Sequence, residues 1–185
     1  MLEEYTHQLN ERMEKSLDAL RKAFNRIRTG RAHPSLLDGL SIDYYGANTP
    51  ISQLASIVVE DARTLALTLW EKNLVPEVEK SILRSDLGLN PNTAGTVIRV
   101  PLPALTEESR KAFGRQAKQE AEKARVSVRN VRRDVLSNVK SLEKTKSISK
   151  DEERRIQDEV QKITDRFISR VDDLLTEKEK DLMDI

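Results

Sequence analysis

Apolar residues recur every three or four positions along three long segments of the chain, residues 1–29, 106–146 and 149–185. This spacing puts them on one face of an α-helix, so the sequence predicts three long amphipathic helices. The apolar positions are Leu2, Tyr5, Leu9, Met13, Leu17, Leu20, Phe24 and Ile27 in the first segment, Phe113, Ala117, Ala121, Ala124, Val128, Val131, Val135, Val139 and Leu142 in the second, and Ile156, Val160, Ile163, Phe167, Val171, Leu174, Leu175 and Leu182 in the third. No helix can bury such a face alone, which indicates a long three-helix bundle.

The ends of these helices also carry sequence signals. Thr106 is followed by Glu107 and Glu108, and acidic residues are favoured in the first turn of a helix. Ser149 and Glu152 have the spacing of a capping box. The connection near residues 144–148 is short, so the second and third helices are expected to be antiparallel neighbours.

The middle of the chain follows a different pattern. All six prolines lie between residues 34 and 103, where they prevent long helices. Alternating apolar positions predict a strand over 64–70, and residues 40–45, 56–60 and 96–100 are further candidates. Residues 76–84 read as a short helix with Val78, Ile82 and Leu83 facing inward. The middle is therefore expected to be a small mixed α/β domain.

The predicted fold class is α+β, with one domain inserted into another. Residues 1–29 and 106–185 form the bundle domain, and residues 31–104 form the insert. Two stretches of chain join them, near 29–31 and 103–106, and a double connection acts as a hinge with a restricted direction. The hinge residues are Thr29, Gly30, Pro103 and Ala104, of which Gly30 tolerates backbone angles that other residues avoid.

Charge changes this picture, because a formal net charge of only +1 hides a strong segregation. Residues 106–146 hold 12 basic and 6 acidic side chains, whereas residues 147–185 hold 8 and 12. At about 100° per residue, most of the basic residues of the second helix fall within an arc of about 100°. They are Lys111, Arg115, Lys118, Arg125, Arg129, Arg132 and Arg133, interrupted only by Glu122.

Two interpretations of this basic face remain open. In the first, it is a solvated surface that pairs with the acidic third helix. In the second, it binds the phosphates of a nucleic acid, because each planar guanidinium can donate to two phosphate oxygens at once. The use of Arg and the scarcity of acidic partners four residues away favour nucleic-acid contact. Aromatic residues make up only 4% of the chain, so contact to backbone is expected rather than base stacking.

The sequence argues against an enzyme, a metal site and a cofactor. The chain has no cysteine, and neither His7 nor His33 belongs to a catalytic or metal-ligating cluster. Trp70 and the pair Tyr44 and Tyr45 are expected on strands, as core or edge packing with bonded tyrosine hydroxyls. No apolar run approaches the length of about 20 residues that a membrane span needs. With its acidic N-terminus, the protein is expected to be soluble and intracellular.

Three classes of function remain on this basis. A factor that binds RNA through its backbone would use the arginine face. A helical adaptor would use the apolar faces to bind a partner helix without RNA. A small hydrolase with a dispersed site is the weakest of the three.

Several segments then resemble a known family, the bacterial ribosome recycling factors. They occur in the family's order across residues 27–134, and the length of the chain also matches. These segments are Ile27–Ala32, Pro34–Gly39, Tyr44–Gly46 with Thr49–Pro50, Asp86–Asn92, Ile98–Pro103 with Leu105–Glu108, and Val128–Asp134.

The resemblance implies a three-helix bundle with an inserted β/α/β domain, hinged into an L shape like tRNA. It implies a monomeric, cytoplasmic protein that binds large-subunit rRNA of the post-termination ribosome and, with elongation factor G and its GTP hydrolysis, separates the subunits. Arg129, Arg132 and Arg133 would contact rRNA phosphates, and Arg28 and Arg31 are further candidates. Arg125 is added on the geometry of the basic face alone.

Overall fold

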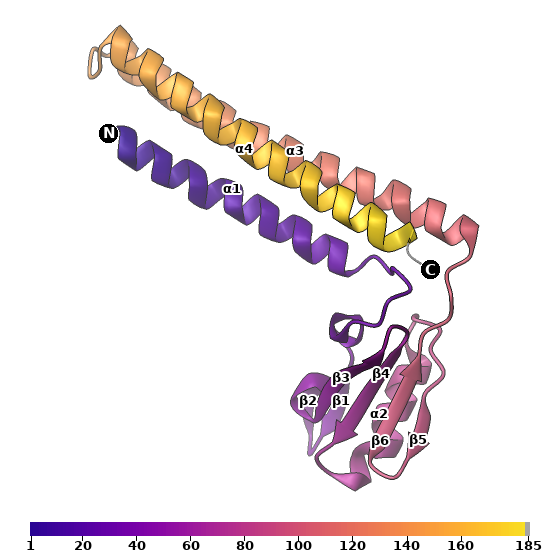
Figure 1. Cartoon of the computed structure of the whole chain (residues 1–185). Coiled ribbons are helices and arrows are strands. Elements are labelled where there is room, and N and C mark those ends of the chain that lie inside the picture. The colour runs from indigo at the N-terminus through magenta and orange to yellow at the C-terminus, as the bar shows by residue number, and fades with distance from the viewer. Residues whose placement is uncertain (184–185) are drawn as a thin grey trace. The chain divides into compact units, whose positions relative to one another are not determined.

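A computed structural model of the chain describes residues 1–183, which form two compact units. The first, here called the bundle unit, consists of residues 1–27 and 111–183, and the second, here called the insert unit, consists of residues 28–110. Figure 1 shows long helices in the first and strands around a short helix in the second. The α+β fold class predicted from the sequence is confirmed.

Three long helices build the bundle unit: α1 (Leu2–Asn25), α3 (Glu107–Lys144) and α4 (Lys150–Met183). The first four residues of α3 are grouped with the insert unit. They run side by side in Figure 1, and the predicted apolar faces supply their buried residues. Leu9, Met13 and Leu17 of α1 are fully buried. On α3 the buried positions begin with small alanines, Ala117 and Ala121, which allow the neighbouring backbones to approach closely.

The turn between α3 and α4 is closed by local hydrogen bonds. Lys146 has a φ of 60°, and its amide and that of Ser147 donate back to the carbonyls of Glu143 and Leu142. This left-handed ending of a helix normally carries glycine. The predicted capping box is confirmed, because the amide of Glu152 donates to Ser149 Oγ and the amide of Ser149 donates to Glu152 Oε2, both at 3.1 Å.

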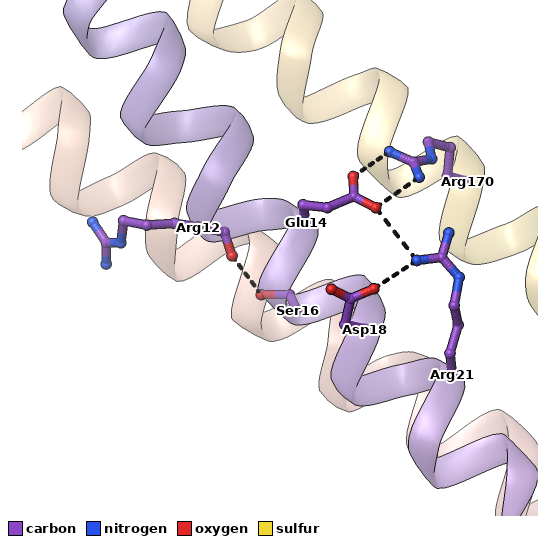
Figure 2. A network of polar contacts seen from close by, with 6 residues as sticks. All are labelled: Arg12, Glu14, Ser16, Asp18, Arg21 and Arg170. Atoms are coloured by element: carbon purple, nitrogen blue, oxygen red, sulfur yellow. Dashed lines mark hydrogen bonds and ion pairs between the residues drawn. The ribbon is translucent and has the colours of Figure 1, made fainter.

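Polar contacts fix α1 against both of its neighbours. Arg170 of α4 donates to both carboxylate oxygens of Glu14, at 2.7 and 3.0 Å, and Arg21 bridges Glu14 and Asp18 (Figure 2). The hydrogen bond from Arg170 is the main reason that the pKa of Glu14 lies below its ordinary value. On the other side, Ser16 Oγ lies 2.7 Å from Ser127 Oγ of α3.

Two antiparallel sheets and one helix form the insert unit. The larger sheet has the order β3 (Ala55–Asp61), β4 (Thr64–Leu69), β6 (Val97–Pro101) and β5 (Asn92–Ala94). The smaller sheet pairs β1 (Ser41–Tyr44) with β2 (Ala47–Pro50). Helix α2 (Val75–Arg84) lies against the larger sheet in Figure 1. Short 3-10 turns, η1 (Pro34–Leu37), η2 (Ile51–Gln53) and η3 (Lys72–Leu74), complete the unit.

The core of the insert unit lies between α2 and the inward face of the sheet. Leu65 and Leu67 of β4 are fully buried, as the alternating pattern predicts, and they share a core with Val78 and Ile82 of α2. Leu83, expected to face inward, is instead 53% exposed. At the end of a ten-residue helix, a position next to Ile82 turns about 100° away from the core.

The aromatic residues differ most from the sequence-based expectation. Trp70 follows β4, and 67% of its surface is exposed, so core packing is wrong for it. Tyr45 lies in the turn between β1 and β2 and is 79% exposed. Tyr44 is half-buried on β1, and its hydroxyl donates to Glu71 Oε1 at 2.6 Å, so its expected polar partner is confirmed.

Candidate nucleic-acid interface

The basic residues predicted on one face of the second helix lie on α3, which is unbroken from Glu107 to Lys144. The buried face of α3 includes Ala124, Val128, Val131 and Val135. Because these residues face the core, the arginines between them lie toward the sides of the bundle. Four candidates, Arg125, Arg129, Arg132 and Arg133, therefore share this helix, but their surroundings differ.

Arg125 is held by carboxylates from two helices. Its Nε and Nη2 donate to Asp172 Oδ1 of α4 at 2.9 and 2.6 Å, and its Nη1 donates to Glu122 Oε2 at 3.1 Å. The hydrogen bond to Asp172 is the main cause of a raised pKa at Arg125. Only 20% of the Arg125 side chain is exposed, and its ion pair with Asp172 links α3 to α4. Because two carboxylates offset its positive charge, Arg125 is a poor partner for a phosphate.

Arg129 is only loosely paired. Its Nη1 lies 3.4 Å from Glu122 Oε1, and half of the side chain is exposed. An exposed pair at this distance contributes little, because water screens both charges. Since Glu122 also binds Arg125, one carboxylate is shared between two guanidinium groups. Arg129 therefore retains most of its positive charge for an external partner.

Arg132 and Arg133 carry the largest unmatched charge of the four. Arg133 is exposed, and within residues 1–183 no acidic side chain pairs with it. Arg132 is half-buried, and its Nε is shielded from solvent without a hydrogen-bond acceptor among the described residues. A buried N–H without an acceptor lowers the free energy of unfolding. The stability of the isolated protein therefore gives no reason for an arginine at position 132.

The two other arginine candidates belong to the insert unit. Arg28 is half-buried, and its Nη1 donates to the carbonyl of Leu87 at 3.0 Å, which ties it to the segment after α2. Arg31 is exposed, and its amide donates to Thr29 Oγ1 at 3.4 Å. Of these two residues, Arg31 is the more exposed.

The candidate hinge residues lie in two irregular segments of the insert unit. Gly30 has a φ of 75°, a left-handed conformation that strains any other residue. A Cβ atom at Gly30 would stand 3.5 Å from Leu105 Cγ, so the two segments lie close together. Pro103 and Ala104 are exposed and belong to neither a helix nor a strand, and Thr29 is half-buried.

Within residues 1–183, no group of three or more acidic or histidine side chains is placed to hold a metal ion. None of the helices described in that range has the length and hydropathy needed to cross a membrane.

One contact escaped the sequence reasoning, the pairing of Asp172 with Arg125. The acidic character of the third helix signalled such pairing in general, but the rotation of α4 relative to α3 decides which arginine is held. That rotation follows from packing, which a residue-by-residue pattern does not contain.

Comparison with known proteins identifies the family. The profile described as "Ribosome recycling factor" matches residues 20–183, which is most of the chain. The chain belongs to the ribosome recycling factor family. The ribosome-recycling factor of Saccharophagus degradans is 57% identical over 185 residues and covers all of both chains. That of Hahella chejuensis is 57% identical over 183 residues, with 99% of each chain covered.

Solved structures of the family agree with the fold. A solution structure of a ribosome recycling factor matches with a TM-score of 0.77 and 37% identity, over 100% of this chain and 98% of the other. A ribosome recycling factor of T. thermophilus matches with a TM-score of 0.70 and 42% identity over the whole of both chains. That factor was described together with E. coli elongation factor G, bound to the E. coli post-termination complex. Family membership assigns the present chain to ribosome recycling in protein biosynthesis, and to binding of the ribosome.

Proposed function

We propose that the chain binds the post-termination ribosome through large-subunit rRNA and, together with elongation factor G and its GTP hydrolysis, separates the two subunits. The rRNA part rests on the surface formed by Arg129, Arg132 and Arg133, three arginines within five residues of α3. Among residues 1–183, only Arg129 of these three pairs with a carboxylate, that of Glu122 at 3.4 Å. Support for the partner comes from the related T. thermophilus factor, described with elongation factor G on a post-termination complex.

The arginine surface fits a phosphate backbone for electrostatic and geometric reasons. Arg offers a planar fork of donors that can hold two phosphate oxygens at once. The α3 helix keeps the forks on one stiff element, at a rise of about 1.5 Å per residue. Binding of this kind releases counterions from the RNA, so its affinity falls steeply as the salt concentration rises. Arg31, an exposed residue, is a further contact on this proposal. The hydrogen bond of Arg28 and the ion pairs of Arg125 give those two a structural role as well.

The proposed mechanism is mechanical and involves no catalysis by the chain itself. Residues 1–29 with 106–185 act as the rod-like domain and residues 31–104 as the smaller one, with the hinge at 29–31 and 103–106. The left-handed Gly30 supplies backbone freedom at this hinge. The arginine surface anchors the rod to the large subunit, and force applied by the partner GTPase turns the hinge and displaces an intersubunit contact. On this proposal the chain acts as a cytoplasmic monomer and binds no nucleotide.

Sedimentation of the protein with purified large subunits across a salt series tests the rRNA contact. We expect Arg133→Ala to weaken binding and to lower the salt slope by about 0.7–0.9, the change for one lost phosphate contact. Arg155→Ala is the matched control, because Arg155 is an exposed arginine on α4, away from the proposed surface. Equal losses in the two variants would show that only overall charge matters. Self-association without any affinity for large subunits would favour the helical adaptor instead.

The subunit-splitting step is tested separately, with ribosomes left on mRNA after termination. Light scattering should fall when the protein, elongation factor G and GTP are all present, because the separated subunits scatter less. Omission of any one of the three, or replacement of GTP by a form that is not hydrolysed, should leave the signal unchanged. Splitting by elongation factor G and GTP alone at the same rate would contradict the proposal.

A further inference from the structure

Two strongly exposed aromatic side chains lie on the insert unit, and the proposed rRNA contact of α3 does not involve them. Trp70 and Tyr45 expose 67% and 79% of their surfaces. Aromatic residues make up only 4% of the chain, and Trp70 is its single tryptophan. Large aromatic side chains normally bury most of their area, and those that stay exposed are enriched where proteins bind partners.

The backbone of Tyr45 makes its exposure harder to explain by folding alone. Tyr45 and Gly46 form the two-residue turn between β1 and β2, with φ angles of 50° and 85°. Such a turn favours Asn at its first position, because a bulky side chain is strained at positive φ. The ring of Tyr45 meets that of Tyr44 edge to face, with the centroids 4.6 Å apart. The turn thus holds an aromatic ring in water at a cost in stability.

A groove lies between the rings of Trp70 and Tyr44, and Tyr45 borders it only through its contact with Tyr44. It has a volume of about 370 Å³ and is lined by Tyr44, Thr49, Gln53, Leu54, Trp70, Glu71 and Leu74. We call it the Trp70 groove. Glu71 is the one charged residue in this lining. Its Oε1 accepts the hydroxyl of Tyr44, which orients the carboxylate and leaves Oε2 able to accept a further donor.

The groove therefore combines aromatic faces with a fixed carboxylate. An arginine side chain matches both, since its guanidinium stacks on aromatic rings and donates to a carboxylate in the same plane. The surrounding charge agrees, because residues 30–105 contain 8 acidic and 6 basic side chains. A phosphate backbone would meet the negative charge of Glu71 and is disfavoured. The chemistry of the groove thus selects a basic protein segment over RNA.

We propose that the Trp70 groove binds an arginine side chain from a basic protein segment of the ribosome-bound assembly. This inference rests on the proposed function, because it assigns a protein contact to the insert unit while α3 contacts rRNA. The arginine stacks against Trp70 and Tyr44 and donates to Glu71. Through this contact the protein partner binds the insert unit, independently of the contact between the arginine surface of α3 and rRNA.

The test uses the full chain in the subunit-splitting assay, with the concentration of the protein varied. Trp70→Ala and Glu71→Gln should each lower the initial rate of splitting, measured at limiting concentrations of the protein, about tenfold, the loss expected for one central interface side chain. Glutamine keeps an acceptor for the Tyr44 hydroxyl, so the second change removes charge with little else. Leu83→Ala is the matched control, because it also removes an exposed apolar side chain of the insert unit, and it should split subunits at the wild-type rate.

Two further variants separate a protein contact from a structural role and from an RNA contact. Tyr45→Asn suits the turn better, so it should be at least as stable as the wild type to heat. It also removes the ring that packs edge to face against Tyr44 of the groove, so it should split subunits more slowly. Glu71→Arg should be worse than Glu71→Gln, because it repels an arginine. Faster splitting by Glu71→Arg than by the wild type would overturn the proposal in favour of an RNA phosphate.

The salt dependence of large-subunit binding distinguishes a failure of this inference from a failure of the proposed function. Trp70→Ala should leave the salt slope unchanged, whereas Arg133→Ala should lower it. If the wild type neither binds large subunits nor splits ribosomes, the proposed function itself fails. If the wild type does both, and Trp70→Ala and Glu71→Gln split at the wild-type rate, only the arginine-binding groove is overturned.

Discussion

Replacement of Arg132 by methionine should stabilise the isolated protein while it weakens ribosome binding. The side chain of Arg132 is half-buried on α3, and its Nε has neither solvent nor an acceptor among the described residues. Methionine has a similar length and a similar helix propensity, so it can fill the space of the arginine stem without disturbing the helix. The substitution therefore removes an unsatisfied N–H and one positive charge and changes little else.

The size of the stability gain follows from these two changes. A buried polar group without a partner costs about 1–3 kcal/mol. Relief of repulsion from Arg129, three residues away on the same helix, adds a few tenths of a kcal/mol. We therefore expect a net stabilisation of about 1 kcal/mol or slightly more, after some loss of packing around the guanidinium. For a unit of about 100 residues, each kcal/mol raises the melting temperature by about 4–8 °C.

The loss of ribosome binding should be larger than the gain in stability. A hydrogen bond to a charged group contributes about 1.5–3 kcal/mol, which corresponds to about a 10- to 150-fold weaker complex. Sedimentation with large subunits would measure this loss, and circular dichroism during heating would measure the stability. Arg133→Met is the control, since Arg133 is exposed: its binding should fall similarly, with a stability change within about 0.5 kcal/mol.

The two measurements can each refute the reasoning about Arg132. A melting temperature that falls by several degrees in Arg132→Met would show that the guanidinium is part of the bundle's own packing. An unchanged affinity and salt slope would remove Arg132 from the rRNA contact. Only the combination of higher stability and weaker binding supports a residue whose charge serves the complex at the expense of the free protein.

Three further changes test the bundle unit by thermal or chemical unfolding. Lys146→Gly should stabilise it by about 1 kcal/mol, because glycine removes the strain of the left-handed turn between α3 and α4; a loss of stability would contradict this account of the turn. Ser149→Ala should cost about 1 kcal/mol, because it removes the acceptor for the amide of Glu152. Glu14→Gln should cost about 1 kcal/mol or less at neutral pH, because the pair with Arg170 is partly exposed. Since the pKa of Glu14 is lowered in the folded state, mainly by the hydrogen bond from Arg170, the stabilisation from this pair is fully present above the ordinary pKa of an unfolded glutamate. It disappears as the pH falls through the lower folded value. The difference between Glu14→Gln and the wild type should therefore shrink in acid, and a difference that stays constant down to pH 2 would contradict the role of this ion pair.

The long helices could be predicted from the sequence because their signal is repeated many times. Each apolar position of α1, such as Leu9 or Met13, repeats the same helical phase, so single exceptions do not alter the prediction. The capping box at Ser149 is similarly local, since both of its hydrogen bonds join residues three apart. Strands β2 and β5 escaped prediction because they have no alternating apolar face: β5 is exposed at all three positions.

For the candidate site, too, the features set by local sequence could be predicted, and those set by contacts distant in the chain could not. That four arginines share one face of α3 follows from their spacing. That Arg125 is neutralised while Arg133 is not depends on Asp172, which lies 47 residues from Arg125 in the chain. No local pattern contains the rotation of one helix against another, so the sequence predicts the cations but not which of them remain available.

The exposed Trp70 could have been predicted, and the reason it was not is informative. Leu65, Leu67 and Leu69 face inward, so a strand that continues by one residue points Trp70 outward with Thr68. The alternation thus favoured exposure, and only the general preference of tryptophan for burial opposed it. Tyr45 is a similar case, because it takes the first position of the Tyr45–Gly46 turn, which does not suit a bulky residue.

Residues in unfavourable surroundings often serve function. When the local pattern places a residue where its type is rarely found, and the placement brings the fold no evident stability, a role in binding is the simplest physical explanation. The unsatisfied Nε of Arg132 is a further case, because a buried N–H without an acceptor lowers the stability of the free chain.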